Sequence, residues 1–205
     1  MPRPAKKSRY HHGDLATALI DKAIELIDER GVSGFSLAEA SRRLGVTVAA
    51  PYRHFADRDE LLASVAVRAV HALAEAVAGQ VRPDSSPAEQ LAAVAAGYVR
   101  FAVDRRPLFQ VLFGAGLDKR RYPELATASE DTARTLLRPA LVLCGGDEAA
   151  AADLGTAIGA LAHGYAMFLL DGTFGAVGSR AEAVAGQART AALALATSWP
   201  GVRSA

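Results

Sequence analysis

A chain of 205 residues with a single cysteine, Cys144, cannot form an intramolecular disulfide. A chain without disulfides suits a reducing compartment, so we expect a cytoplasmic protein. The basic residues at its start have no apolar stretch behind them, and we expect no signal peptide. The longest weakly polar run, 154–170, is shorter than the roughly 20 residues that a membrane-spanning helix needs. We interpret it as a buried helix and expect no membrane partner.

Motifs of common enzyme chemistry are also missing. None of the five histidines has the spacing of HExxH or of a similar metal-binding pair. The sequence contains no G-x-S-x-G, no P-loop and no G-x-G-x-x-G. The glycine-rich stretch GTFGAVG at 172–178 follows a predicted helix rather than a strand, which argues against a nucleotide-binding turn. We therefore expect no catalytic residues, no metal ion and no cofactor.

Alternation of apolar and polar residues, the pattern of a strand, is absent as well. Alanine, the residue with the highest helix propensity, is abundant instead. Four segments begin with a polar cap that a glutamate follows three residues later, which is the capping-box signature of a helix start. These pairs are Ser36 with Glu39, Asp57 with Glu60, Ser86 with Glu89 and Ser179 with Glu182. The sequence therefore predicts an all-α protein.

A linker rich in proline and serine, GQVRPDSSP at 79–87, divides the expected helices into two groups. The first group predicts a three-helix head followed by one connecting helix, with a domain boundary near residue 80. The second predicts a helical domain over 80–200. Pro139 is expected to kink the helix that contains it. The expected helices cover about 14–30, 37–44, 48–54, 57–78, 87–105, 107–115, 123–143, 147–170 and 180–198.

The corner between the second and third of these helices is very short. Gly45 can adopt the positive φ that such a corner requires, and Thr47 can cap the third helix. Ser41 is small enough for the two helices to cross closely. A small core is expected beneath them. These features predict a helix-turn-helix. The expected core residues are Leu37, Ala40, Leu44, Val46 and Phe55.

The third helix, within GVTVAAPYRHF at 45–55, carries few large apolar residues. In a helix-turn-helix, the second helix of the pair enters the DNA major groove. The short side chains at 48–50 would let its backbone approach the bases, while Tyr52, Arg53 and His54 would reach phosphates. The spacing leaves open a helix pair that binds no nucleic acid. The basic residues before position 13 could lie along the same polyanion. They are Arg3, Lys6, Lys7 and Arg9.

The stretch FSLAEASRRLGVTVAAPYRHFADRDELL at 35–62 resembles the DNA-binding domain of TetR/AcrR-type transcriptional regulators. The resemblance covers about 12–72. It implies that residues 48–50 face the bases, that Thr47, Tyr52 and His54 contact DNA, and that Ser36 and Arg58 lie near phosphates. The expected DNA-binding residues are therefore Ser36, Thr47, Val48, Ala49, Ala50, Tyr52, Arg53, His54 and Arg58.

Beyond residue 80, LAHGYAMFLLDG at 161–172 is similar to a C-terminal domain type named for a Trp-His-Gly motif, with Ala162 in place of the tryptophan. Small residues on the last two helices, including Gly155, Gly159, Ala185 and Ala188, are expected to form a four-helix homodimer interface. Ordinary packing within one chain is the alternative. A dimer would read a pseudo-palindromic operator, and the family resemblance implies a repressor.

Aromatic and long apolar residues cluster in the second domain and could line a cavity for a small-molecule effector, or simply form core. His163 could hydrogen-bond the ligand. An effector that binds the DNA-free state more tightly would release the operator. The alternative function is a helical small-molecule carrier that does not bind DNA. The expected ligand-binding residues are Tyr98, Phe101, Phe109, Phe113, His163 and Met167.

Overall fold

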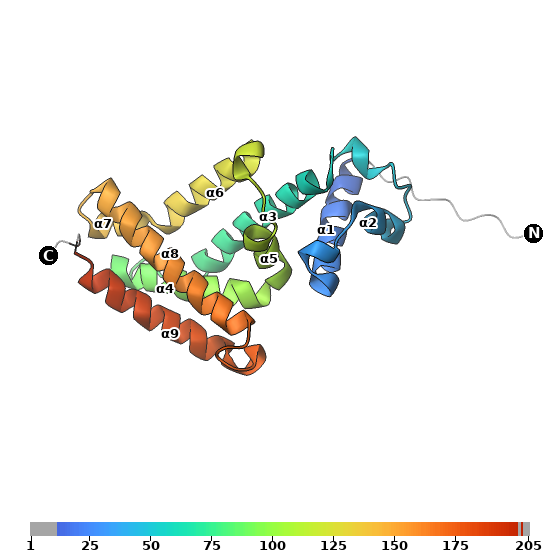
Figure 1. Ribbon diagram of the computed structural model, residues 1–205. Coiled ribbons are helices and arrows are strands. Elements are labelled where there is room, and N and C mark those ends of the chain that lie inside the picture. The colour runs from blue at the N-terminus through green and yellow to red at the C-terminus, as the bar shows by residue number, and fades with distance from the viewer. Residues whose placement is uncertain (1–11, 201, 203–205) are drawn as a thin grey trace, which may run out of the picture.

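The computed structural model describes residues 12–200 and residue 202, and every regular element within them is helical (Figure 1). This confirms the all-α prediction. The basic arm expected before residue 13 falls largely outside the described residues. The α-helices are α1 (His12–Arg30), α2 (Leu37–Leu44), α3 (Arg58–Ala78), α4 (Pro87–Asp104), α5 (Arg106–Gly114), α6 (Pro123–Leu136), α7 (Arg138–Leu143), α8 (Glu148–Leu170) and α9 (Val177–Ser198). Three 3-10 turns, η1 (Val32–Gly34), η2 (Pro51–Arg53) and η3 (Lys119–Arg121), complete the set.

Three of the four predicted caps are confirmed. The side chains of Ser36, Asp57 and Ser86 each accept a hydrogen bond from the amide three residues later, at 3.2, 2.8 and 3.3 Å. Ser86 forms the complete capping box, because the Glu89 carboxylate also accepts the Ser86 amide at 2.8 Å. These local signals place the starts of α2, α3 and α4 correctly.

The fourth cap, at Ser179, was predicted wrongly. Helix α9 begins two residues earlier, and the Ser179 hydroxyl lies inside it, donating to the carbonyl of Ala176 at 3.2 Å. Glu182 instead forms a two-pronged ion pair with Arg100 of α4, at 2.9 and 2.8 Å. The Glu182 carboxylate therefore binds Arg100, which is distant in sequence, rather than the backbone at the start of α9.

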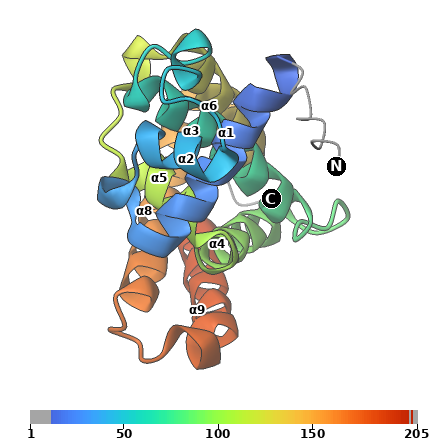
Figure 2. The ribbon, with the colours of Figure 1, turned by 90° about the vertical axis from the view of Figure 1, so that its right-hand side faces the viewer.

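The head of the molecule comprises α1, η1, α2, η2 and the start of α3, and it lies at one end of the fold (Figures 1 and 2). Leu19, Leu26, Phe35 and Phe55 are buried in its core. Arg43 of α2 donates two hydrogen bonds to Glu29 of α1, at 2.6 and 2.7 Å, which fixes the two helices against each other.

The body is built around α4, which packs against α8 and α9 and is buried along most of its length. Helix α3 joins the two parts, since it contacts α1 in the head and α4, α5 and α6 in the body. The approach of α3 to α4 is close at Gly97, where an added Cβ would lie 3.1 Å from the Cα of Val77. The expected break near Pro139 is confirmed, because α6 ends at Leu136 and α7 begins at Arg138.

Two helices, α3 and α8, are long and apolar enough to cross a membrane by length and composition alone. Both pack within the fold. Helix α3 lies against four other helices, and α8 lies against α4, α7 and α9. The core helix of a globular helical protein has the same composition, which accounts for their apolar character without a membrane.

Candidate nucleic-acid interface and effector cavity

The predicted third α-helix over 48–54 is not formed. A turn at 48–50 leads into the three-residue 3-10 turn η2, with hydrogen bonds from the amides of Arg53 and His54 to carbonyls three residues earlier. Pro51 has no N–H and cannot donate to the carbonyl of Thr47, so that α-helical bond is missing, and the single bond of α-helical spacing here runs from the Phe55 amide to the Pro51 carbonyl at 3.0 Å. The Thr47 side chain makes no capping bond, and Ala50 takes the cap position instead. The expected recognition helix is therefore a shorter and tighter element.

The segment from Thr47 to Phe55, here called the recognition segment, presents most of the expected DNA-binding side chains on the surface. Val48 is 52% exposed and Tyr52 is 56% exposed, values that are unusual for large apolar or aromatic residues in this fold. Thr47, Ala49 and Arg53 are also exposed, while Ala50 and His54 are partly buried. Pro51 and Phe55 are buried and anchor the segment to the head. The structure thus brings the predicted residues together on one exposed turn.

The corner before the recognition segment has the predicted geometry. Gly45 adopts φ 68° and ψ 24°, and its amide bonds to the carbonyls of Ser41 and Arg42. A side chain at this φ would be strained, which explains the glycine. Ser41 is fully buried and donates its hydroxyl to the carbonyl of Leu37 at 2.8 Å. The short crossing therefore holds the recognition segment at a fixed angle to α2.

Arg58 donates hydrogen bonds to two backbone carbonyls of the head. Its guanidinium donates to the carbonyl of Val32 at 2.5 Å and to that of Phe35 at 3.3 Å, and it lies 5.7 Å from the Phe35 ring centroid. It also pairs with Asp59. These contacts hold η1 against the start of α3, and the expected position of Arg58 near phosphates stays a prediction. Ser36 remains exposed while it caps α2.

Carboxylates in the head are tied to arginines. The hydrogen bonds from Arg43 lower the pKa of Glu29, and those from Arg42 and Arg43 lower the pKa of Glu39. Both carboxylates therefore stay ionised and neutralise cations on α1 and α2. Arg53 on the recognition segment forms no ion pair within the described part of the chain, and its charge remains available.

A cavity of about 420 Å³ lies at the junction of head and body and is here called the junction cavity. Four of the six expected ligand-binding residues line it, namely Phe109 and Phe113 of α5 and His163 and Met167 of α8. Gly31 and Val32 of the head complete the wall. Phe113 and Met167 are 46% and 42% exposed, so the cavity is partly open.

The other two expected ligand-binding residues lie on α4 behind this wall. The Tyr98 hydroxyl is 2.9 Å from His163 Nδ1, and the two rings contact each other. Burial raises the pKa of Tyr98, which keeps the phenol protonated. Phe101 is only 1% exposed and is part of the core rather than of the cavity wall. Because α4 is buried on nearly every side, its apolar pattern could not distinguish a cavity residue from a core residue.

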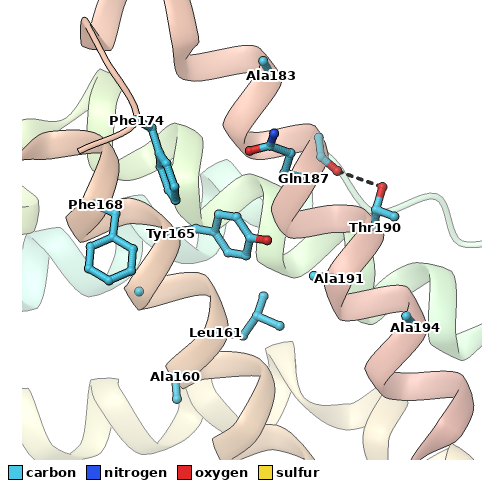
Figure 3. Close-up of a pocket in the computed structure, with 12 residues that line it drawn as sticks. Ala160, Leu161, Tyr165, Phe168, Phe174, Ala183, Gln187, Thr190, Ala191 and Ala194 are labelled. Carbon is cyan, nitrogen blue, oxygen red and sulfur yellow. Dashed lines mark hydrogen bonds between the residues drawn. The ribbon is translucent and has the colours of Figure 1, made fainter. Parts of the chain in front are cut away.

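A second hollow, here called the α8–α9 groove, runs between the outer faces of α8 and α9 and measures about 1030 Å³ (Figure 3). Leu161 and Tyr165 of α8 point into it, and Phe174 of the connecting loop lies with its ring centroid 5.9 Å from that of Tyr165. Small residues such as Gly164, Gly186 and Ala194 line the remainder, and Phe168 is 52% exposed at its edge.

Most of the small residues expected at the homodimer interface lie inside one chain, while Gly159 is exposed. Leu154, Ile158, Ala185, Ala188 and Ala192 are buried within one chain, where α8 and α9 pack on α4. Gly155 is also internal, since a Cβ there would lie 2.7 Å from a methyl group of Leu137. The exposed small residues lie on the opposite face, in the α8–α9 groove.

Several cavity and groove residues were missed from the sequence. The four-residue spacing of Ala160, Gly164 and Phe168 was a signal for the groove, because it places them on one face of α8. Nothing local predicted Gly31 and Val32 as cavity residues, since they come from a different part of the chain.

The described residues contain no cluster of three or more histidine, cysteine, aspartate or glutamate side chains that could hold a metal ion. Cys144 is buried, and burial raises the pKa of its thiol. A protonated, enclosed thiol is a poor nucleophile.

Comparison with known proteins gives two family matches. Residues 19–65 match the family model described as bacterial regulatory proteins, tetR family, and residues 91–191 match the model described as tetracyclin repressor-like, C-terminal domain. A curated relative, the uncharacterized HTH-type transcriptional regulator YobS of Bacillus subtilis, is 29% identical over 102 residues. That match covers 50% of this chain and 53% of YobS, so it spans only about half of the relative's length.

Solved structures extend the likeness to nearly the whole chain. A protein with unknown function from Rhodococcus sp. RHA1 has a TM-score of 0.73 and 25% identity, covering 97% of this chain and 100% of its own. The multidrug binding protein EbrR, complexed with imidazole, has a TM-score of 0.63 and 17% identity, covering 93% of this chain and 96% of its own. At 17% identity the second likeness concerns the fold alone.

Proposed function

Because the chain belongs to the TetR family of helix-turn-helix transcriptional regulators, we propose that it is a DNA-binding repressor that acts as a homodimer and responds to a small molecule in the cytoplasm. The family consists of regulators rather than enzymes. The observation that carries the proposal is the recognition segment, a short turn that exposes Val48 and Tyr52 beside Arg53, which has no ion pair among the residues that the structure describes.

Binding to DNA uses two kinds of contact. The short side chains of Val48 and Ala49 allow the backbone to approach base edges, where Val48 can contact a thymine methyl group. Tyr52 and Arg53 extend toward phosphates and supply affinity that depends on salt.

Domain boundaries at 12–72 and 80–200 and the Trp-His-Gly resemblance of 161–172 stay predictions.

A second copy of this chain is the partner that fits the α8–α9 groove. Its apolar surface is contiguous and shallow, and Gly164, Gly186 and Ala194 let a pair of helices approach closely. Pairing α8 and α9 with their copies gives a four-helix arrangement with a two-fold axis. Two recognition segments related by that axis read two half-sites about one helical turn apart, which defines a pseudo-palindromic operator.

The junction cavity is the proposed effector site. EbrR, a relative in fold, is a multidrug binding protein, which supports a small-molecule role for this architecture. The cavity wall includes both head and body, so an occupant changes the relative stability of head orientations. It releases DNA only when it binds the DNA-free state more tightly than the DNA-bound state.

An electrophoretic shift assay with duplex DNA from the region upstream of the protein's own gene tests the proposal. We expect a shift that weakens as salt rises, with a roughly 10-fold loss of affinity in Tyr52→Ala. Val142→Ala, which shortens an exposed side chain on α7, is the control and keeps wild-type affinity. No shift at low salt would contradict the regulator and favour a small-molecule carrier.

A further inference from the structure

The neighbouring Tyr98 determines which ring nitrogen of His163 carries the proton. The phenol stays protonated, and its oxygen lies 2.9 Å from His163 Nδ1, its one hydrogen-bond partner among the described residues. If Nδ1 carried a proton and donated it, the half-buried phenol proton would have no acceptor. Such an orphaned donor is costly. The Tyr98 hydroxyl therefore donates to an unprotonated Nδ1, and the imidazole proton is on Nε2.

The Nε2–H group of His163 is available to a ligand. It has no hydrogen-bond partner within the described part of the chain, yet the single buried and unpartnered side-chain polar atom found there is Ser129 Oγ. His163 Nε2 is thus not sealed from solvent, and the residue lines the junction cavity. The cavity therefore contains a fixed hydrogen-bond donor.

Aromatic rings surround this donor, while the polar side chains of Arg106, Gln110 and Asp171 also line the cavity. The His163 ring is stacked on Phe109, with centroids 5.7 Å apart and an angle of 26°, and its centroid lies 4.9 Å from that of Phe113. Two charged residues stand among the lining residues, Arg106 and Asp171, and both are exposed and of opposite sign. The charges therefore favour neither an anion nor a cation, while the rings favour a flat aromatic molecule.

We propose that the junction cavity binds a neutral aromatic molecule with a carbonyl-type oxygen, which accepts a hydrogen bond from His163 Nε2. Tyr98 is the positioning residue that fixes the tautomer. The assignment rests on the proposed function for its role as an effector site, but the binding chemistry stands apart from DNA recognition. The ligand also touches Gly31 and Val32, and the carbonyl of Val32 is held by Arg58 at the start of α3.

Two probes of nearly equal shape test this assignment. 2-Acetylnaphthalene carries the carbonyl acceptor, and 2-isopropenylnaphthalene replaces that oxygen with a methylene group. Calorimetric titration of the full chain is expected to give a roughly 3- to 10-fold preference for the acetyl compound. In His163→Phe both probes bind with similar affinity, because the donor is gone. Val142→Ala, at an exposed side chain of α7 that does not line the cavity, is the control and retains the preference.

Tyr98→Phe provides a second route if His163→Phe does not fold, as judged by circular dichroism. Without the phenol, Nδ1 can carry the proton, so the preference falls while binding of the isopropenyl compound is kept. Equal binding of the two probes to the wild type, or no binding of either, overturns the assignment. Upstream DNA is titrated on the same samples. Acetyl preference without DNA binding refutes the regulator alone, and DNA binding without acetyl preference refutes the cavity assignment alone.

Discussion

At the scale of single residues, two arginines five positions apart have different roles. Arg53 is exposed on the recognition segment and forms no ion pair among the described residues. Arg58 is partly buried and donates to two carbonyls of the loop after α1. Sequence patterns treat both as cations beside a helix-turn-helix, and only the fold separates an exposed charge from one that holds the head together.

This difference gives a matched prediction. Arg53→Ala should leave the free energy of unfolding unchanged. It should reduce the magnitude of the slope of log affinity against log salt concentration by about one. Arg58→Ala should lower the free energy of unfolding by about 1 kcal/mol, because two carbonyls lose a charged donor. Urea melts and salt titrations of DNA binding measure both. If Arg58→Ala reduced the salt dependence while Arg53→Ala lowered the stability, Arg58 rather than Arg53 would be the phosphate contact.

The ion pair between Arg43 and Glu29 predicts a response to acid. Its hydrogen bonds hold the pKa of Glu29 below the ordinary value of 4.5. The pair therefore contributes stability above pH 4.5, and this is lost as the pH falls through the lowered pKa. Glu29→Gln should be slightly less stable at pH 7 and should lose less stability on acidification.

Urea midpoints at pH 7 and pH 3 measure this effect. Glu130→Gln, at an exposed glutamate of α6 without an ion pair in the described chain, is the control and should follow the wild type. Both glutamates lie on the surface, so the effect is small. A Glu29→Gln variant with the same pH dependence as the wild type would show that the pair does not act in solution.

At the scale of elements, local signals predicted helix starts well and helix faces poorly. The caps at Ser36, Asp57 and Ser86 act within one turn, so a short pattern contains the needed information. The start of α9 was missed because Glu182 is used by Arg100, which is distant in sequence. The inward face of α8 and α9 was misassigned because small residues occur on every side of both helices.

The recognition segment shows a different limit. Apolar periodicity and the glycine corner predicted a helix-turn-helix, and the corner formed as expected. Pro51 cannot donate to the carbonyl of Thr47, and the amides of Arg53 and His54 bond to carbonyls three residues earlier. The corner was therefore predictable from the sequence, while the 3-10 geometry of the segment that follows it was not.

The crossing of α3 and α4 can be tested with one methyl group. Gly97→Ala places a Cβ 3.1 Å from the helix backbone at Val77, so α3 must shift, and we expect a loss of about 1–3 kcal/mol in the free energy of unfolding. Gly159→Ala, in the middle of α8 with nothing within 4 Å of the added Cβ, should instead gain about 0.5–1 kcal/mol. Equal free energies of unfolding for the two variants in urea would contradict the close approach of α3 to α4.

At the scale of the whole molecule, the exposed apolar residues gather where functions are proposed. Val48 and Tyr52 lie on the recognition segment, Phe113 and Met167 at the junction cavity, and Phe168 at the α8–α9 groove. The cavity combines Gly31 and Val32 with residues of α5 and α8 that are far away in sequence. For that reason it could not be located from sequence, although most of its aromatic members were identified.

The groove predicts how the protein associates. Ala194→Arg should convert a dimer to a monomer in sedimentation velocity, because it puts an unpaired charge into the proposed apolar interface. Ala133→Arg, at an exposed alanine of α6, keeps the dimer. A variant at Ala194 that still sediments with twice the mass of one chain would place the interface elsewhere.

The central claim is that two recognition segments, one from each subunit, read duplex DNA. Selection of bound sequences from a random duplex pool tests binding, symmetry and spacing together. The account predicts enrichment of an inverted repeat whose half-sites lie about one helical turn, roughly 10 base pairs, apart, with the enrichment lost in Tyr52→Ala. Enrichment of no sequence at low salt, or of a single unrepeated motif that Tyr52→Ala still selects, would contradict it.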